Sequence, residues 1–252
     1  MDRRQRAVAG NLDRKNMILR HIYLALGSNL GERLDNLRQA LHRLPPAVQP
    51  LRVSPVYETP PWGITEQPRF LNMAAEVITW LEPLPLLDHL KQIEQRMGRT
   101  AAARYGPRLI DLDIIFCEDI IFTANQLRIP HPRLAERAFV LLPLNDLVPA
   151  KIHPMLGKSV AELLAALDLS GITPYPLPEG YELLPPGGWR SLPDDLRAAL
   201  QAEPQAAAAF LRLPPSHQRE YLKFIDEARK SETRRKRIET TLSMLSVREN
   251  AQ

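Results

Sequence analysis

Four apolar segments and two amphipathic segments follow one another between residues 22 and 116, and their order limits the folds open to this chain. Leucines at helical spacing between 30 and 44, and apolar residues between 86 and 97, predict two helices. The apolar segments have the length and residue types of β-strands: IYLALG at 22–27, VQPLRVSPVY at 48–57, FLNMAAEVITWL at 70–81 and LIDLDIIF at 109–116. The order strand, helix, strand, strand, helix, strand predicts an α+β fold with a ferredoxin-like antiparallel sheet. Helices would pack on one face and leave the other open to a ligand.

Changes in composition divide the chain into four parts. Residues 1–19 are basic, and we expect a disordered tail, with Met17 as an alternative start. Residues 20–170 hold the strand and helix pattern and end in further apolar segments typical of helices. Residues 171–190 are rich in Pro and Gly, which predicts a linker. Residues 191–252 contain amphipathic stretches such as SHQREYLKFIDEARK, which predict a small all-helical accessory module.

Charge and cysteine content exclude several classes of protein. The net charge is +4, but residues 1–20 alone carry six basic and two acidic side chains, so the basic balance is weak evidence for nucleic-acid binding. Cys117 is the single cysteine, which excludes an internal disulfide and a multi-cysteine metal cage and favours a cytoplasmic protein. No apolar stretch approaches the roughly 20 residues that a membrane-spanning helix needs, and no membrane partner is expected.

Two aspartates, Asp111 and Asp113, lie inside the apolar segment LIDLDIIF. Side chains alternate along a strand, so both carboxylates should project from one face while Leu112 and Ile114 project from the other. A buried carboxylate without a cation costs several kcal/mol or takes up a proton. Two carboxylates on one rigid strand suit Mg²⁺ together with waters and phosphate oxygens. For this motif alone, a structural, salt-bridged pair is an equal alternative.

Three arginines precede the aspartates, at Arg99, Arg104 and Arg108. Arginines in a loop are by themselves usually a solvated surface. Their guanidinium groups nevertheless match phosphate oxygens well. Next to a metal-binding carboxylate pair, they predict a site for a polyphosphate.

Four segments in order, YLALGSNLG, YETPPWG, GPRLIDLDI and IPHPRLAERAFVLLPL, resemble the hydroxymethyldihydropterin pyrophosphokinase family over residues 20–167. The resemblance implies Mg²⁺-dependent transfer of pyrophosphate from ATP to 6-hydroxymethyl-7,8-dihydropterin in folate biosynthesis, giving AMP and the pterin pyrophosphate. It implies two Mg²⁺ ions held by Asp111 and Asp113. It also implies catalytic roles for these aspartates and for Arg99 and Arg104.

The same resemblance implies binding residues for both substrates. Those at the nucleotide are Lys91, Glu94, Arg108, Ile114, His131 and Arg137. Those at the pterin are Thr59, Pro60, Trp62, Phe70, Asn72 and Phe139, with the two phenylalanines enclosing the ring. A phenylalanine is more often a core residue. Asn72 favours the pterin interpretation, because its amide can hydrogen-bond the polar edge of a pterin.

The C-terminal module contains LPPSHQREYLKFIDEARKSETRRKRI, which resembles the helical domain of proteins described as bacteriocin-protection or OmpD-associated. The resemblance implies no partner. Within it, RKSETRRKR at 229–237 has six basic residues and one acidic residue. A solvated helix face is the simpler interpretation, because residues 191–252 hold 11 basic and 9 acidic residues, a net charge of only +2. Nucleic acid is therefore not expected as a partner.

Two other functions stay open at this point. The chain would be a catalytically inactive nucleotide- or pterin-binding protein acting through its helical module if metal or pterin positions were broken. It would be a nucleotide-sugar transferase using the D-x-D pair if the strands formed a doubly wound sheet, which the strand order does not indicate.

Overall fold

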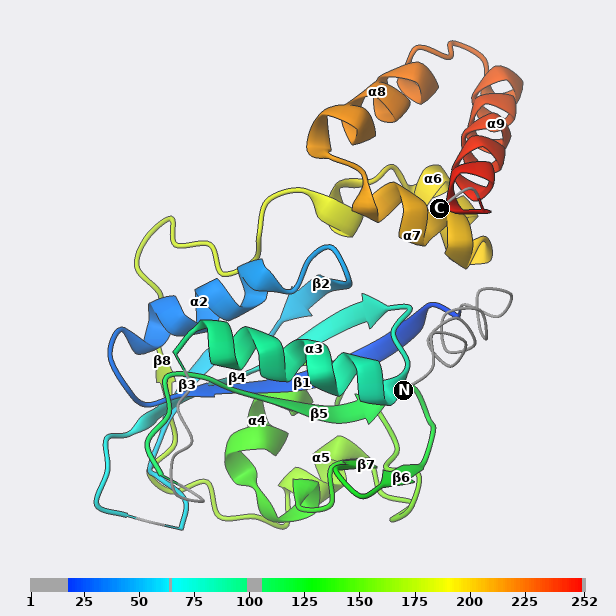
Figure 1. Ribbon diagram of the computed structural model, residues 1–252. Helices are drawn as coiled ribbons and strands as arrows, with labels where there is room; N and C mark the ends of the chain where they lie inside the picture. Colours follow the sequence, from blue (N-terminus) through cyan, green and yellow to red (C-terminus); the bar gives the residue numbers. More distant parts are fainter. Residues whose placement is uncertain (1–17, 64, 99–105, 251–252) are drawn as a thin grey trace, which may run out of the picture. The chain divides into compact units, whose positions relative to one another are not determined.

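The computed structural model describes residues 18–63, 65–98 and 106–250, with side chains up to Ser246. These residues form two compact units, Arg20–Arg190 and a helical unit from Ser191 onward (Figure 1). Within the described part of the chain, no helix combines the length and apolarity needed to cross a membrane.

The first unit is built on a six-stranded antiparallel sheet with the order β5-β1-β4-β3-β8, in which β2 also pairs with β4. Its strands are β1 (Arg20–Ser28), β2 (Val48–Val53), β3 (Val56–Thr59), β4 (Phe70–Thr79), β5 (Asp111–Cys117) and β8 (Thr173–Tyr175). The second predicted strand is divided into β2 and β3 around Pro55, because proline has no N–H to donate to a ladder. A hairpin of β6 (Phe122–Ala124) and β7 (Leu127–Ile129) follows β5.

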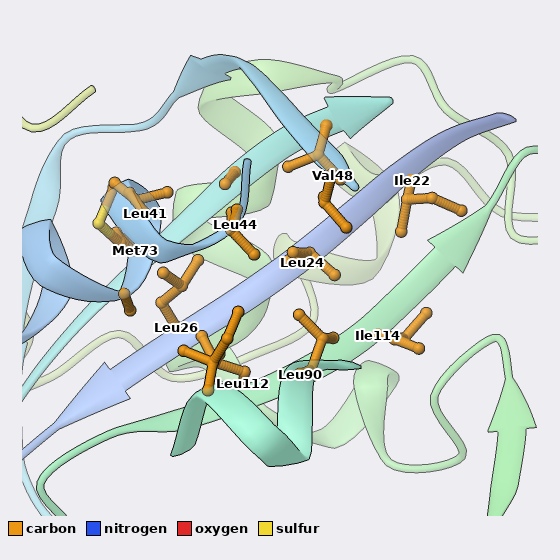
Figure 2. Close-up of a cluster of buried hydrophobic side chains, with 14 of the residues drawn as sticks. Ile22, Leu24, Leu26, Leu41, Leu44, Val48, Met73, Leu90, Leu112 and Ile114 are labelled. Carbon is orange, nitrogen blue, oxygen red and sulfur yellow. The ribbon is translucent and has the colours of Figure 1, made fainter. Parts of the chain in front are cut away.

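Helices α2 (Arg33–Arg43) and α3 (Pro83–Arg96) cover one face of this sheet. Pro83 begins α3, where its missing N–H removes no helical hydrogen bond. The core beneath the helices is aliphatic and almost fully buried; it includes Ile22, Leu24 and Leu26 of β1, Leu41 of α2, Leu90 of α3, and Leu112 and Ile114 of β5 (Figure 2). Each such side chain stabilises the fold by about 1.5–3 kcal/mol.

The opposite face is also partly covered, which differs from the expected single layer of helices. Helices α4 (Ala138–Leu147) and α5 (Val160–Leu164) form a second core there with Tyr23 and Phe116. A β-bulge explains how Phe116 reaches this face: β5 pairs Ile114 with Leu24 and Phe116 with Tyr23, so Ile115 is the extra residue. The bulge sends Ile114 into the first core and Phe116 into the second.

Residues 171–190 form an extended strap on the first unit and are not the linker predicted from their Pro and Gly content. Within the strap, β8 pairs with β3. Leu183 and Trp189 are only 5% and 2% exposed. Leu183 packs in the first core, and the Trp189 backbone N–H donates to Gln49 Oε1 of β2 at 3.4 Å. These contacts hold the segment to the sheet, and we place the boundary between the units near Ser191.

The helical unit contains α6 (Asp194–Ala202), α7 (Pro204–Arg212), α8 (Pro215–Asp226) and α9 (Ser231–Asn250). Its buried side chains include Leu196, Leu200, Phe210, Ile225 and Leu245. Several residues of the basic run 229–237 make ion pairs inside this unit. Arg234 bonds Asp226 at 2.8 Å and also pairs with Asp195, while Lys236 pairs with Glu232 at 3.0 Å. These pairs support the interpretation of the run as a solvated helix face.

We predict that residues 17–190 unfold cooperatively without the helical unit, whereas truncation after residue 178 lowers stability. The shorter fragment loses Leu183, which packs in the first core, and loss of a large buried side chain costs roughly 2–5 kcal/mol. Thermal unfolding followed by circular dichroism compares the two fragments with the full chain. Equal melting temperatures for 17–178 and 17–190 would contradict a stabilising strap, and a non-cooperative 17–190 would contradict the boundary.

Candidate active site

A cavity of about 370 Å³ opens on the second face of the sheet, beside the first turn of α4. Its lining comes from strands β1, β3, β4 and β5 and from Lys91 of α3. The start of the loop 60–69, residues 106 and 108, and residues 131–140 complete it. The lining includes Lys91, Arg108, Arg133 and Arg137, but only two carboxylates, Asp111 and Asp113. Glu94 and Glu136, outside the lining, pair with Lys91 and Arg133. The four cationic side chains offer N–H donors that suit an anionic ligand.

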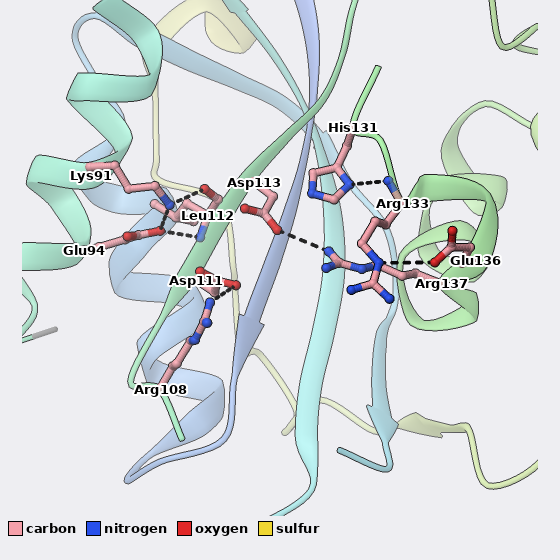
Figure 3. Close-up of polar contacts among 10 residues, drawn as sticks. All are labelled: Lys91, Glu94, Arg108, Asp111, Leu112, Asp113, His131, Arg133, Glu136 and Arg137. Carbon is pink, nitrogen blue, oxygen red and sulfur yellow. Dashed lines mark hydrogen bonds and ion pairs between the residues drawn. The ribbon is translucent and has the colours of Figure 1, made fainter. Parts of the chain in front are cut away.

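The two aspartates project into this cavity from β5, opposite Gly27 and Ala25 of β1. Their side chains are 24% and 31% exposed, whereas Leu112 between them is fully buried in the first core. This confirms the predicted alternation. Arg108 Nη1 lies 2.6 Å from Asp111 Oδ2, and Arg137 Nη1 lies 3.7 Å from Asp113 Oδ2 (Figure 3). Each carboxylate thus has a guanidinium group beside it.

Glu94 of α3 holds the strand that carries the aspartates. Its Oε1 accepts hydrogen bonds from the Leu112 backbone N–H and from Lys91 Nζ, both at 2.7 Å. Lys91 Nζ also donates to the Leu112 carbonyl at 3.3 Å (Figure 3). These contacts give partners to the polar groups on the outer edge of β5.

Of the residues predicted at the nucleotide, four line the cavity and two, Glu94 and Ile114, do not. Lys91, Arg108, His131 and Arg137 line the cavity. Glu94 is 1% exposed and acts on the β5 backbone and on Lys91. The Ile114 side chain lies in the core on the helix-covered face. Sequence alone does not separate a side chain that lines a cavity from one that supports it.

His131 follows β7, and its backbone N–H donates to the Ile115 carbonyl at 3.1 Å. Its ring Nδ1 accepts a hydrogen bond from the Arg133 backbone N–H at 3.2 Å. Burial lowers the pKa of His131, while the nearby Asp113 carboxylate raises it and Arg137 lowers it. The ring is therefore neutral at neutral pH, with its proton on Nε2. Nε2 can donate a hydrogen bond to an anionic ligand.

All six residues predicted for the pterin line the same cavity: Thr59, Pro60, Trp62, Phe70, Asn72 and Phe139. The two phenylalanines are half-buried, and Phe139 also packs against the second core. Asn72 Nδ2 donates to Thr59 Oγ1 at 2.7 Å, which fixes the orientation of the amide. Aromatic faces and a fixed amide suit a flat heterocycle with a polar edge.

Gly27 is a cavity residue that sequence reasoning missed. A Cβ atom at this position would lie 2.7 Å from Asn72 Oδ1, which no ordinary contact allows. Gly27 pairs with Asn72 across β1 and β4, so the missing side chain leaves room for the amide. The available signal was a glycine inside an apolar strand, which often marks a close approach. Arg133, which also lines the cavity, had no such signal.

Arg99 and Arg104 lie outside the described residues. Among the residues that are described, no group of three or more His, Cys, Asp or Glu side chains is placed to hold a metal ion. Asp111 and Asp113 are thus the candidate metal ligands in this cavity. Two carboxylates leave coordination positions for water and phosphate oxygens, which fits the preference of Mg²⁺.

Comparisons with known proteins show which families this chain resembles. The model of the family 7,8-dihydro-6-hydroxymethylpterin-pyrophosphokinase (HPPK) matches residues 23–149, and that of the family Bacteriocin-protection, YdeI or OmpD-Associated matches residues 190–247. A Pseudomonas aeruginosa 2-amino-4-hydroxy-6-hydroxymethyldihydropteridine pyrophosphokinase is 42% identical over 162 residues, covering 63% of this chain and 99% of the relative. The protein of the same name from Bacillus subtilis is 48% identical over 127 residues, covering 50% of this chain and 76% of the relative.

Other relatives are much longer. The Dictyostelium discoideum folic acid synthesis protein is 46% identical over 135 residues, covering 54% of this chain, and the chain spans only 20% of that relative. A Plasmodium falciparum HPPK-DHPS crystal structure superposes with a TM-score of 0.52 at 18% identity, covering 60% of this chain and 46% of that one. That likeness confirms the fold. Because the family model spans half of the sequence, and the Pseudomonas relative matches over almost its whole length, this chain belongs to the 7,8-dihydro-6-hydroxymethylpterin-pyrophosphokinase family.

Proposed function

We propose that this chain transfers pyrophosphate from ATP to the hydroxymethyl group of 6-hydroxymethyl-7,8-dihydropterin, giving AMP and the pterin pyrophosphate in folate biosynthesis. One observation carries the proposal: the carboxylate pair and the slot formed by aromatic residues and Asn72 open into one cavity of about 370 Å³. A flat heterocycle and a polyphosphate would meet there. Family membership and the names of the relatives support the same reaction.

In this reaction the hydroxymethyl oxygen attacks the β-phosphorus of ATP. The bond from that phosphorus to the oxygen bridging the α- and β-phosphates breaks, AMP leaves, and the hydroxyl proton is released. The protein's task is to align the two substrates and to balance the charge on the phosphates. Asn72, Thr59 and the aromatic residues would orient the pterin. Lys91, Arg108, Arg137 and the Nε2–H of His131 would contact the nucleotide.

Asp111 and Asp113 would hold Mg²⁺, and the family resemblance leads us to propose two ions. Bound Mg²⁺ neutralises charge on the phosphate oxygens and orients them. The catalytic roles of Arg99 and Arg104 remain a prediction from the sequence. We further propose a cytoplasmic location, since the single cysteine, Cys117, is buried and not in a disulfide. We propose that the helical unit is an accessory domain, and we assign no partner to it.

The full chain incubated with ATP, Mg²⁺ and 6-hydroxymethyl-7,8-dihydropterin should form AMP in equal amount to the pterin pyrophosphate. Separation of nucleotides by chromatography measures this directly. ADP in place of AMP would refute pyrophosphoryl transfer. Binding of both substrates without turnover would favour the inactive binding protein.

We predict that Asp111→Asn or Asp113→Asn lowers turnover by roughly 10²-fold or more, because each removes a charged metal ligand. Melting temperature should change little, since both side chains are partly exposed. Steady-state kinetics and thermal unfolding measure the two effects. Asp119→Asn is the matched control: Asp119 is 88% exposed and lies outside the cavity lining, paired with Lys151. Normal turnover in both cavity variants would remove the metal assignment.

We predict that Gly27→Ala raises the KM for the pterin about tenfold or more, with a smaller effect on the KM for ATP. The added methyl group would displace Asn72 Oδ1, which lies 2.7 Å from the Cβ position, and loss of one good hydrogen bond costs about that factor. Asn72→Ala should have a similar effect, and the double variant should lose little more, because both act on one amide. Additive losses would show that Gly27 acts independently of Asn72.

A further inference from the structure

The loop 60–69 joins β3 to β4 and places Trp62 in the cavity. The second half of this loop is held by polar contacts from residues that follow β1. Asn29 Nδ2 donates to Gln67 Oε1 and to the Pro68 carbonyl, both at 3.1 Å. Arg33 Nη1 donates to the Arg69 carbonyl at 2.8 Å. These contacts fix residues 67–69.

The first half of the loop contacts a different part of the protein, through the ring of Trp62. The guanidinium carbon of Arg133 lies 4.0 Å from the centre of this ring. The Phe139 ring lies 6.5 Å away at an interplanar angle of 54°, and the guanidinium carbon of Arg137 lies at 5.3 Å. Gly63 follows with φ of +91°, a backbone conformation that turns the chain directly after the ring.

The guanidinium of Arg133 is oriented by a second contact. Its Nε lies 3.2 Å from Glu136 Oε2, within the turn before α4 (Figure 3). A planar cation held in this way over an aromatic face is attracted by the ring electrons and by dispersion. The backbone N–H of the same residue donates to Nδ1 of His131. Arg133 therefore contacts a predicted pterin residue with its side chain and a predicted nucleotide residue with its backbone.

We infer that Arg133 is a positioning residue for the pterin, which acts by holding the Trp62 ring as one wall of the slot. This inference rests on the proposed function and names a residue that the family resemblance did not assign. Trp62 is half-buried and packs beside Phe139. Once the ring is held, less of its rotational freedom is lost when the pterin enters. Arg133 thus preorganises the pterin side of the cavity.

A competing role for Arg133 is direct contact with the phosphates of ATP, since it also lines the cavity. A lysine at position 133 could replace arginine in a phosphate contact but not in the contact with the Trp62 ring. An ammonium group keeps the positive charge for a phosphate but lacks the planar face that covers an indole ring. Loss of a phosphate contact would raise the KM for ATP, whereas loss of the contact with Trp62 would raise the KM for the pterin.

The test uses the full chain and compares Arg133→Ala, Arg133→Lys and Trp62→Leu in steady-state assays of AMP formation. We expect Arg133→Ala to raise the KM for the pterin about 3- to 30-fold, the range typical of a cation–π contact, with the KM for ATP changed less than about threefold. Arg133→Lys should recover little of the loss. The Arg133 backbone N–H that donates to His131 Nδ1 is retained in all Arg133 variants.

A double variant, Arg133→Ala with Trp62→Leu, shows whether the two residues act together. It should resemble Trp62→Leu alone, because the arginine has no ring left to hold. Arg128→Ala is the control for charge and should behave as the unaltered chain, since Arg128 is exposed on β7 and outside the cavity lining. All melting temperatures are measured alongside.

Three results would overturn the inference. An increase confined to the KM for ATP, with recovery by lysine, would assign Arg133 to the phosphates. Independent, additive losses in the double variant would separate it from Trp62. A loss matched by a fall in melting temperature would make its role structural. Failure of the unaltered chain to form AMP would instead refute the proposed function, so the two failures are distinguishable.

Discussion

The site depends on how Leu112 is held between Asp111 and Asp113. Its apolar side chain must be buried, whereas its backbone N–H and carbonyl need hydrogen-bond partners. The side chain is fully buried among aliphatic residues. The backbone faces the outer edge of the sheet, where no further strand pairs with β5 in the described structure. Glu94 and Lys91 bond the Leu112 N–H and carbonyl. The flanking Asp111 and Asp113 are thereby held rigidly toward the cavity.

The β-bulge at Ile115 separates two regions on the second face of the sheet: a packed core on one side and the cavity on the other. Beyond the bulge, Phe116 and Tyr23 pack against α4 and α5. Before it, Asp113 and Asp111 lie beside Ala25 and Gly27, whose small size leaves the cavity open. Helix α4, which helps to complete the second core, also carries Phe139 and begins directly after Arg137 at the cavity wall. Stability and site formation therefore depend on the same contacts.

Much of this arrangement follows from sequence. The segment order predicted the antiparallel sheet, and strand alternation predicted which residues of LIDLDIIF face the core. The family resemblance assigned site roles to twelve of the residues that line the cavity: Thr59, Pro60, Trp62, Phe70, Asn72, Lys91, Arg108, Asp111, Asp113, His131, Arg137 and Phe139. Their identities carry chemistry that is independent of context, since carboxylates, guanidinium groups and aromatic rings have fixed ligand preferences.

Contacts between distant segments decided the rest. Pro and Gly content predicted a linker at 171–190, but cross-strand pairing and the burial of Leu183 in the first core make this segment part of the first unit. Glu94 and Ile114 were predicted at the nucleotide, yet one supports a backbone and the other fills the core. Gly27 acquires its role from Asn72, and Arg133 from Trp62. The sequence alone determined which chemistry was present and the pattern of strands and helices. Only the tertiary structure decided which groups meet, because an interaction between residues far apart in the chain depends on their separation in space.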